Sequence, residues 1–420
     1  MASEELDEIL EQVAAKEAEA EAAAAEYDGH PRWRTTLYCM WAAQMLAIIG
    51  FSFVMPFIPF YIRELGVTNE RLLPIWAGMM VTGSGIAMGI VAPLWGWVAD
   101  HYGRKPMVQR AMFGGAVILA LMGVVKNARQ LLALRVMQGA LTGTVSASVA
   151  LVSSVVPRAQ MGYSLGMMQM AVFCGSSIGP YLGGVAAQNL GYRRPFFVTG
   201  ALLLVAGLLV LVGVRERFVR PARPAPQEGS AARPLGRALP PGVLIVLLMF
   251  SLLNLSGSFV GPIFPLFVEH VSGTQGEAAE QTGLILAISG ATAALAAIAI
   301  GRVSDRVGYK RILVLSTVLA GLMCFPQAAA HSVAQLLLMR ALLGLFAGGM
   351  LPAMNSVLAT AVPRENLGRA YGLATTASAV GWAVGPALGG WAASAFGLRV
   401  PFVIMGCLHL ALALAQQISL

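Results

Sequence analysis

The sequence predicts an all-α integral membrane protein whose twelve transmembrane helices form two pseudo-symmetric six-helix halves. Three observations lead to this fold class. Hydrophobic residues make up 57% of the 420 residues and charged residues only 11%, whereas soluble domains carry roughly 25% charged residues. Apolar runs of about 20 residues, the length that crosses a bilayer, follow one another along the chain. Blocks of sequence from the first half recur in the second half in the same order.

Twelve apolar runs account for most of the chain. They are long and rich in Leu, Ala and Gly, which favours helices over the short alternating strands of a membrane barrel. The runs are 37–62, 74–99, 107–126, 131–154, 162–187, 196–215, 242–268, 280–301, 311–329, 333–358, 367–393 and 398–416. We therefore expect an N-terminal six-helix bundle over residues 36–215 and a C-terminal six-helix bundle over residues 242–420.

Two polar segments lie outside these runs. Residues 1–35 are acidic and rich in Ala and Glu, so we expect a solvated, partly helical tail, with a partner-binding helix as the alternative. This segment lacks the apolar core of a secretory signal. Residues 216–241 are rich in Arg and Pro and predict a flexible cytoplasmic linker between the bundles.

Positive charge is distributed unevenly between the two sides of the predicted bundle. Of the 28 Lys and Arg residues, 19 lie in segments on the same side as both termini and the linker, and seven lie on the opposite side. Because Lys and Arg favour the cytoplasmic side, we expect a multi-pass protein of the cytoplasmic (inner) membrane with both termini in the cytoplasm. The net charge of +8 sits at span ends and therefore does not indicate binding of nucleic acid.

The internal repeat relates six blocks of sequence at an offset of 205 or 206 residues. PFIPFYIREL at 56–65 aligns with PIFPLFVEHV at 262–271, and GSSIGPYLGG at 175–184 aligns with GWAVGPALGG at 381–390. Transporters are often built from such repeats, with the substrate site near the membrane midplane between them.

Arg135 is the charged residue that stands out within a span. Arg135, Gln138 and Thr142 follow a helical spacing and share one face. A charge at membrane depth is costly and normally faces a cavity or a partner, so Arg135 is a candidate for substrate binding. The alternative is an arginine near the end of the span that extends its charge to the membrane interface.

From about residue 35 to residue 416, the chain resembles the major facilitator superfamily. The stretch GWVADHYGRKP at 96–106 is similar to the signature loop of that family, and GRVSDRVGYKR at 301–311 is its second copy. RVMQG at 135–139 is similar to a motif of proton-coupled members, and GSSIGPYLGG to a motif of drug-exporting antiporters. The resemblance implies the twelve-span drug:proton antiporter, or multidrug efflux, branch and transport by alternating access.

The resemblance also implies a set of residues that control the change of conformation. Asp100 would engage a helix N-terminus, where the helix dipole favours an anion, while the alternative is that the loop charges only fix the topology. The prolines would bend their helices and the glycines would permit close packing. The gating candidates are Gly96, Asp100, Gly103, Arg104, Lys105, Gly301, Asp305, Gly308, Lys310, Gly179, Pro180, Gly385 and Pro386.

Further candidates for substrate binding come from polar and aromatic residues on the spans that line the cavity of this family. With Arg135 and Gln138 they are Gln44, Phe51, Asn254, Ser258, Asn355 and Trp382. For each of these, a purely structural hydrogen bond or packing role is the alternative.

Proton coupling has no obvious carboxylate at mid-membrane. Outside the tail, every Asp and Glu lies at or near the end of a span. The nearest candidates for proton coupling are Glu64, Glu269 and His270, whose alternative role is that of solvated rim residues. Histidine titrates near pH 6.5. The missing acid weakens the expectation of cation selectivity.

The predicted function is therefore export of drug-like or amphiphilic small molecules by alternating access, as a proton-coupled antiporter. No G-x-x-x-x-G-K-[ST] loop occurs, so we expect no direct use of ATP. We expect no enzyme activity, no cofactor and no metal. The expected partners are a small-molecule substrate, protons and the lipid bilayer, and the expected state is a monomer. The alternatives are a sugar, anionic or zwitterionic metabolite transporter, and a receptor or scaffold that no longer transports.

Overall fold

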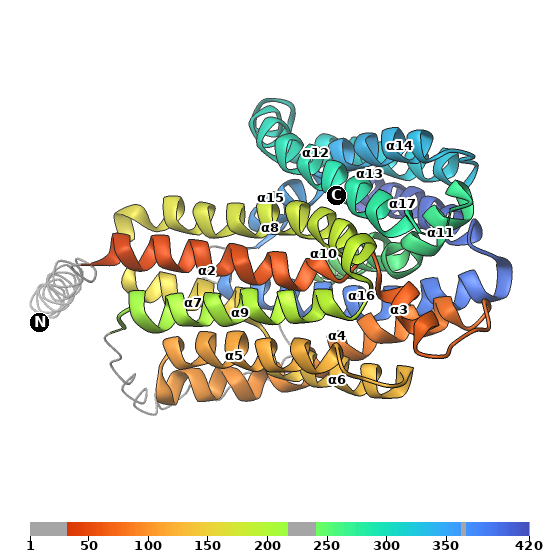
Figure 1. Ribbon diagram of the computed structural model, residues 1–420. Coiled ribbons are helices and arrows are strands. Elements are labelled where there is room, and N and C mark those ends of the chain that lie inside the picture. Colours follow the sequence, from red (N-terminus) through yellow and green to blue (C-terminus); the bar gives the residue numbers. More distant parts are fainter. Residues whose placement is uncertain (1–31, 217–240, 275, 363–366, 420) are drawn as a thin grey trace, which may run out of the picture.

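The computed structural model describes residues 32–216, 241–274, 276–362 and 367–419, and every regular element in these ranges is helical (Figure 1). The acidic segment 1–31 and the linker segment 217–240 lie outside the described residues. The first half comprises α2 (Trp33–Phe53), α3 (Ile58–Glu64), α4 (Leu73–Tyr102), α5 (Arg104–Met122), α6 (Ala128–Leu141), α7 (Thr144–Val155), η1 (Arg158–Gln160), α8 (Met161–Leu190) and α9 (Arg194–Gly213).

The second half repeats this order of helices. It comprises α10 (Pro241–Phe259), η2 (Gly261–Ile263), α11 (Phe264–Ser272), α12 (Ala278–Val307), α13 (Tyr309–Ala328), α14 (Val333–Ala347), α15 (Met350–Ala361), α16 (Leu367–Phe396) and α17 (Val400–Ser419). Each of the twelve predicted runs is therefore occupied by one helix or by two consecutive helices.

Four predicted runs are interrupted, at positions that the repeat equates. Between α6 and α7 the chain turns at Gly143, whose φ is +123°, and the matching break between α14 and α15 falls at Gly348. Pro56 lies in the break between α2 and α3, and Pro262 lies in the matching break between α10 and α11. Proline cannot donate a helix hydrogen bond, which accounts for the two breaks at Pro56 and Pro262. All four runs were predicted as single helices, and each is divided in two.

Helix ends also repeat between the halves. Asn127 caps α6 by accepting a hydrogen bond from the backbone N–H of Gln130, and Ser332 caps α14 by accepting one from Gln335. The tight turns after α4 and α12 use Gly103 at φ +97° and Gly308 at φ +99°, a conformation that side chains with a Cβ rarely adopt.

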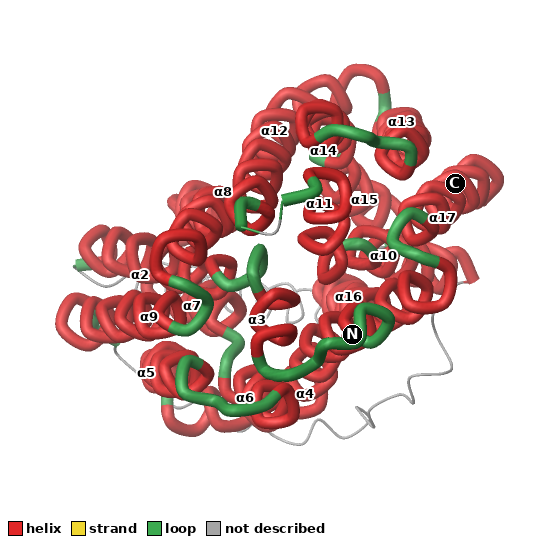
Figure 2. Tube along the Cα trace, turned by 45° about the vertical axis from the view of Figure 1, so that its right-hand side comes forward, coloured by secondary structure: helices red, strands yellow, loops and turns green. Residues whose placement is uncertain are grey.

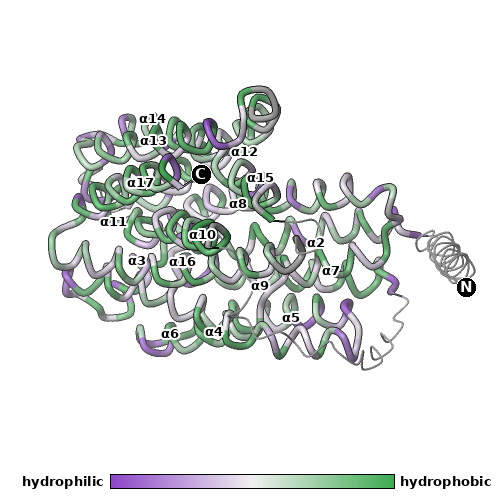
Figure 3. The backbone as a smooth tube through the Cα atoms, turned by 180° about the vertical axis from the view of Figure 1, so that it is seen from behind, coloured by the Kyte–Doolittle hydropathy of each residue, from purple (hydrophilic) through white to green (hydrophobic). Residues whose placement is uncertain are grey.

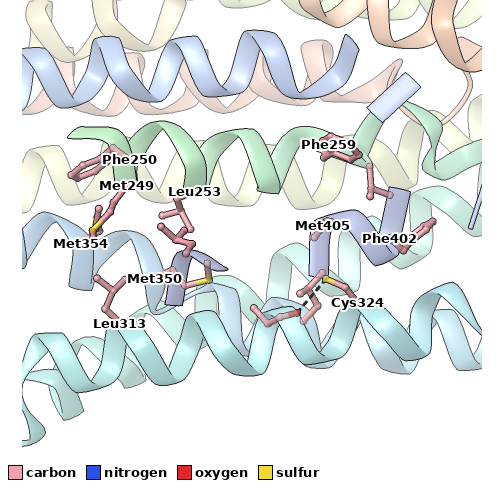
Figure 4. Close-up of a cluster of buried hydrophobic side chains, with 14 of the residues drawn as sticks. Met249, Phe250, Leu253, Phe259, Leu313, Cys324, Met350, Met354, Phe402 and Met405 are labelled. Atoms are coloured by element: carbon pink, nitrogen blue, oxygen red, sulfur yellow. Dashed lines mark hydrogen bonds between the residues drawn. The ribbon is translucent and has the colours of Figure 1, made fainter. Parts of the chain in front are cut away.

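Each half has its own apolar core. One core draws all of its buried residues from the second half, including Met249, Phe250, Leu313 and Phe402 (Figure 4). Two further cores belong almost wholly to the first half, and the residues of the second half that join them come from α11 and α12. The halves are joined mainly along two seams, α8 against α12 and α4 against α16.

Hydrophobic residues run along the helices and hydrophilic residues gather at their ends (Figure 3). Within the described ranges, nine helices or helix pairs are long and apolar enough to cross a membrane. The other three predicted runs are occupied by α5, α12 and α16, of which α5 carries Arg104, Lys105 and Arg110 in its first two turns.

Candidate functional site

The two halves meet at the end of the bundle that carries α3 and α11, which we call the closed end (Figures 1 and 2). Arg63 on α3 donates two hydrogen bonds to the carboxylate of Glu269 on α11, each with an N···O distance of 2.8 Å. Arg63 also pairs with Glu70 at 3.1 Å. The hydrogen bonds to Glu269 hold the pKa of Arg63 above its usual range. The pair lines a hollow of about 700 Å³ that also includes His270.

Glycines allow the backbones of the two halves to touch along both seams. A Cβ atom added to Gly283 on α12 would lie 2.3 Å from the carbonyl oxygen of Pro180 on α8, and one added to Gly78 on α4 would lie 2.4 Å from that of Pro386 on α16. The repeat equates both the two glycines and the two prolines. A real Cβ does not approach a backbone atom this closely, so both seams require glycine at these positions.

The candidates Gly179 and Gly385 pack within their own halves. A Cβ on Gly179 would lie 2.8 Å from the carbonyl oxygen of Ile49 on α2, and one on Gly385 would lie 2.5 Å from that of Leu255 on α10. The same Gly385 lies against the hydroxyl of Ser258, a predicted substrate-binding residue. Ser258 therefore contributes to packing between α10 and α16.

At the other end of the bundle, which we call the open end, the seams separate. Added Cβ atoms on Gly89 and Gly96 of α4, Gly162 and Gly166 of α8 and Gly372 of α16 would meet no atom of the described residues within 4 Å. In the part of the chain that the structure describes, the contacts of seam glycines across the halves lie nearer the closed end. The halves are thus closed at one end and apart at the other.

The signature loop joins α4 to α5 at the open end. Asp100 is exposed there and forms no hydrogen bond or ion pair with the described residues. Within the described ranges no hydrogen bond joins Asp100 to a helix N-terminus, and its role in gating stays a prediction. In the second copy, Gly308 forms the turn and Lys310 is partly buried on α13, while the surroundings of Gly301 and Asp305 lie outside the described part of the chain.

Arg104 and Lys105 tie the loop to neighbouring helices. The Arg104 guanidinium donates to the carbonyl of Ala150 on α7 at 3.1 Å, and Lys105 Nζ donates to the carbonyls of Leu211 and Val214 at the end of α9. Both backbone N–H groups donate to the carboxylate of Glu216 at 2.8 Å. The N-terminus of α5 therefore receives an anion, as the helix dipole favours, but that anion comes from the same half.

Arg135 is buried within the protein, with only 6% of its surface exposed. Its Nη1 donates to Gln138 Oε1 at 3.0 Å, while Nε and Nη2 have no hydrogen-bond partner among the described residues. Arg340, its counterpart in the repeat, lies 4.1 Å from the centre of the Phe264 ring. No described carboxylate pairs with either arginine.

Gln44 lies in the wall of a cavity of about 200 Å³ within the first half, between α2, α7 and α8. Its side chain is 0% exposed, and neither amide atom has a hydrogen-bond partner among the described residues. Phe51, from the same helix, lies instead against Gly115 of α5. The structure therefore does not bring Phe51 to this cavity.

The remaining substrate candidates are dispersed over the second half. Asn254 donates to the carbonyl of Phe250 on its own helix at 2.9 Å. The backbone carbonyl of Asn355 accepts a hydrogen bond from the Tyr371 hydroxyl at 3.2 Å. Trp382 is 40% exposed and lies beside Gly85 at the α4–α16 seam.

The proton-coupling candidates lie near the closed end. Glu64 pairs with Arg193 at 2.9 Å, and both side chains are about 40% exposed. Glu269 is paired with Arg63, as described above, and His270 adjoins it in the hollow of the closed end. No group of three potential metal ligands occurs in the described ranges.

Three functional features escape sequence reasoning: the Arg63 partner of Glu269, the cap formed by Glu216 and the seam glycines Gly78 and Gly283. The first carries a detectable signal. In the aligned blocks PFIPFYIREL and PIFPLFVEHV, Arg63 falls opposite Glu269, and opposite charges at equated positions can meet across a two-fold axis. Glu216 carries no such signal, because an acid after a span is ordinary.

Two repeated bundles of membrane helices, joined at one end and apart at the other, define a secondary transporter. The model of the Major Facilitator Superfamily matches residues 40–279 and 254–418. The chain belongs to this superfamily, which confirms the predicted fold, and it is a multi-pass membrane transporter of small molecules and not an enzyme.

Curated relatives belong to the multidrug-efflux branch that the sequence indicates. The multidrug resistance protein MdtG of Dickeya zeae is 32% identical over 388 residues, covering 92% of this chain and 95% of the relative. MdtG of Klebsiella pneumoniae is 31% identical over 390 residues, covering 92% and 94%.

Solved structures share the fold. A bacterial homologue of the human lysosomal transporter Spinster, in an inward-facing and occupied conformation, has a TM-score of 0.76 at 15% identity, over 93% of this chain and 97% of that one. The human organic anion transporter MFSD10 has a TM-score of 0.67 at 18% identity, over 92% and 100%.

Proposed function

We propose that this transporter exports drug-like or amphiphilic small molecules by alternating access, in exchange for protons. The observation that carries the proposal is the asymmetry of the bundle. The halves touch around Arg63 and Glu269 and are apart at the end that carries Asp100. A transporter that works by alternating access has this arrangement in each of its two access states, and the relatives named for multidrug resistance support export as its direction.

In this proposal both termini and the linker lie in the cytoplasm, the open end faces the cytoplasm and the closed end faces outward. The distribution of Lys and Arg supports this orientation. The protein works as a monomer, because each chain contains both halves. Asp100 acts in the opposite state, when the open end closes and brings a helix of the other half within reach.

Glu269 is the proposed proton acceptor. Its carboxylate is paired with Arg63, and the charged or titratable groups around the pair are Glu70, Arg71, His270, Glu64 and Tyr192. Protonation of Glu269 removes the charge that holds Arg63 and so favours opening of the closed end toward the side with the higher proton concentration. The control is Glu64, which pairs with Arg193 within the first half.

Accumulation of the neutral dye Nile red in cells tests this function. Cells that make the protein are expected to accumulate less dye than cells that make Glu269→Gln, and a protonophore should abolish the difference. Glu64→Gln should leave exclusion within about twofold. Equal accumulation with and without the protein, across neutral and cationic dyes, would overturn the proposal.

Transport of an anionic metabolite is the second candidate. It is favoured by the positive charges of Arg135, which is buried, and Arg340, which is partly buried, because no described carboxylate compensates either of them. A carboxylate of the substrate would supply the missing partner. Uptake or release of labelled organic acids by proteoliposomes, lost in Arg135→Gln, would favour this candidate over export of amphiphiles.

A further inference from the structure

The cavity between α2, α7 and α8 lies within the first half, because all of its lining residues come from these three helices. Five of its seven lining residues are apolar and two are glutamines. The apolar residues are Val145, Val149, Leu165, Met168 and Val172, and the glutamines are Gln44 and Gln169. Gln169 is exposed, whereas Gln44 is wholly buried. The cavity therefore combines an apolar wall with one buried amide.

The Gln44 amide is a buried polar group in the wall of this cavity. An amide can make up to four hydrogen bonds, and in this structure neither its nitrogen nor its oxygen has a partner among the described residues. Leaving a buried polar group unpaired is costly in any protein. A ligand that offers both an acceptor and a donor would satisfy the nitrogen and the oxygen together.

The size and charge of the cavity restrict what can enter it. A closed cavity of about 150 Å³ holds benzene, so about 200 Å³ has room for one aromatic ring with a small polar substituent, and the open side of the cavity leaves space for the rest of a larger molecule. No Lys, Arg, Asp or Glu lines the cavity. A charged group would find no counter-charge in this wall, so the cavity favours a neutral occupant.

We infer that this cavity is a subsite for the uncharged end of an amphiphilic substrate, namely an aromatic ring that carries an amide or a similar paired donor and acceptor. The inference rests on the proposed function, and it names the substrate class of the site to which Gln44 belongs. The cavity should also select neutral compounds over cations. Its wall offers an amide, whereas a cation would require a carboxylate.

Binding of two molecules of nearly the same shape tests the subsite. Benzanilide is two phenyl rings joined by an amide, and trans-stilbene is two phenyl rings joined by a carbon–carbon double bond. Each is titrated, as a radiolabelled probe, into the purified full-length protein in lipid nanodiscs. Gln44→Leu is expected to weaken benzanilide binding about tenfold, the effect of leaving one hydrogen-bonding group unpaired, and to change stilbene binding by less than twofold.

Two further variants separate the cavity from general damage to the fold. Val149→Phe fills the cavity and should weaken both probes by tenfold or more. Gln416→Leu removes another fully buried glutamine with no described amide partner, on α17 of the second half and away from the cavity. It should leave both affinities within twofold, so it is the matched control.

Equal effects of Gln44→Leu on the two probes would overturn the inference, as would undiminished binding of both to Val149→Phe. Tighter binding of tetraphenylphosphonium than of benzanilide would overturn the preference for neutral compounds. These experiments measure binding, so their outcome does not depend on whether the protein transports its ligand. If benzanilide binds as described but dye exclusion in cells fails, the subsite holds and the proposed export is wrong.

Discussion

Arg63 and Glu269 are separated by 206 residues and joined by two hydrogen bonds of 2.8 Å. That separation is the offset of the internal repeat, so each residue occupies the other's place in its own half. The side chains are 24% and 12% exposed, which leaves the pair partly shielded from solvent and keeps it stronger than an ordinary surface pair. The contact therefore ties the halves together where their symmetry axis would pass.

The Arg63–Glu269 pair is expected to stabilise the closed end. Hydrogen bonds to charged groups contribute about 1.5–3 kcal/mol, so Arg63→Gln should raise the accessibility of the closed end about tenfold or more. The measurement is the rate of maleimide labelling of Ser394→Cys, which lines the hollow, in a background without the four native cysteines. The exchange Arg63→Glu with Glu269→Arg should restore slow labelling. Unchanged labelling in Arg63→Gln would contradict this role. So would labelling that remains fast in the charge-exchanged double variant.

The seam glycines are expected to control closure by their size alone. Gly78→Val places a side chain against the backbone of Pro386 and should reduce transport at least tenfold by holding the closed end apart. Gly114→Val, on α5 within the first half, places its Cβ no closer than 3.8 Å to Leu141 and should retain transport within about twofold. Transport by proteoliposomes measures both. Equal effects of the two substitutions would show that closure at Gly78 is unimportant.

Arg135 is expected to lower the stability of the fold and to be required for transport. Its guanidinium is buried without a carboxylate, and an uncompensated buried charge destabilises a fold. The double variant Arg135→Met, Gln138→Leu removes the charge without leaving the Gln138 oxygen unpaired, and should raise the melting temperature by about 2 °C or more while abolishing transport. Arg129→Met, an exposed position on the same helix, is the control. A lower melting temperature in the double variant would contradict this account.

Glu216 is expected to stabilise the start of α5. It accepts hydrogen bonds from two backbone N–H groups, and loss of a helix cap costs about 0.5–2 kcal/mol. Glu216→Ala should lower the melting temperature of the purified protein. Glu216→Gln keeps an acceptor but loses the charge that the helix dipole favours, so its loss should be about half as large. An unchanged melting temperature in Glu216→Ala would exclude the cap as a source of stability.

Tyr192 predicts a loss of stability at alkaline pH. Burial is the largest cause that raises its pKa, and the ring stacks on Phe57. A group with a raised pKa contributes stability that is complete below its unfolded pKa of about 10 and is lost as the pH rises through its folded pKa. The melting temperature of Tyr192→Phe should therefore fall less than that of the unchanged protein between pH 9 and pH 11, because the variant has no hydroxyl to ionise at this position. Parallel curves would contradict the prediction.

The positions of the helices could be predicted because apolar runs and the repeat are properties of the sequence itself. The breaks at Gly143 and Gly348 were missed, since an apolar run reads the same whether its helix is continuous or divided. Gln44 was found as a polar residue within a span, but its cavity depends on how α7 and α8 pack against α2. The contact between Arg63 and Glu269 needs the relative placement of two halves, which no local pattern provides.

Duplication alone could not have produced the contact between Arg63 and Glu269. Two identical halves would bring arginine against arginine, or glutamate against glutamate, across their axis, and like charges at that distance repel each other. An ancestral pair of equal subunits would have needed another means of joining at this end. A change of residue type at this position in one half replaced two like charges with the Arg63–Glu269 ion pair. Because both halves belong to one chain, the two residues of the pair are inherited together.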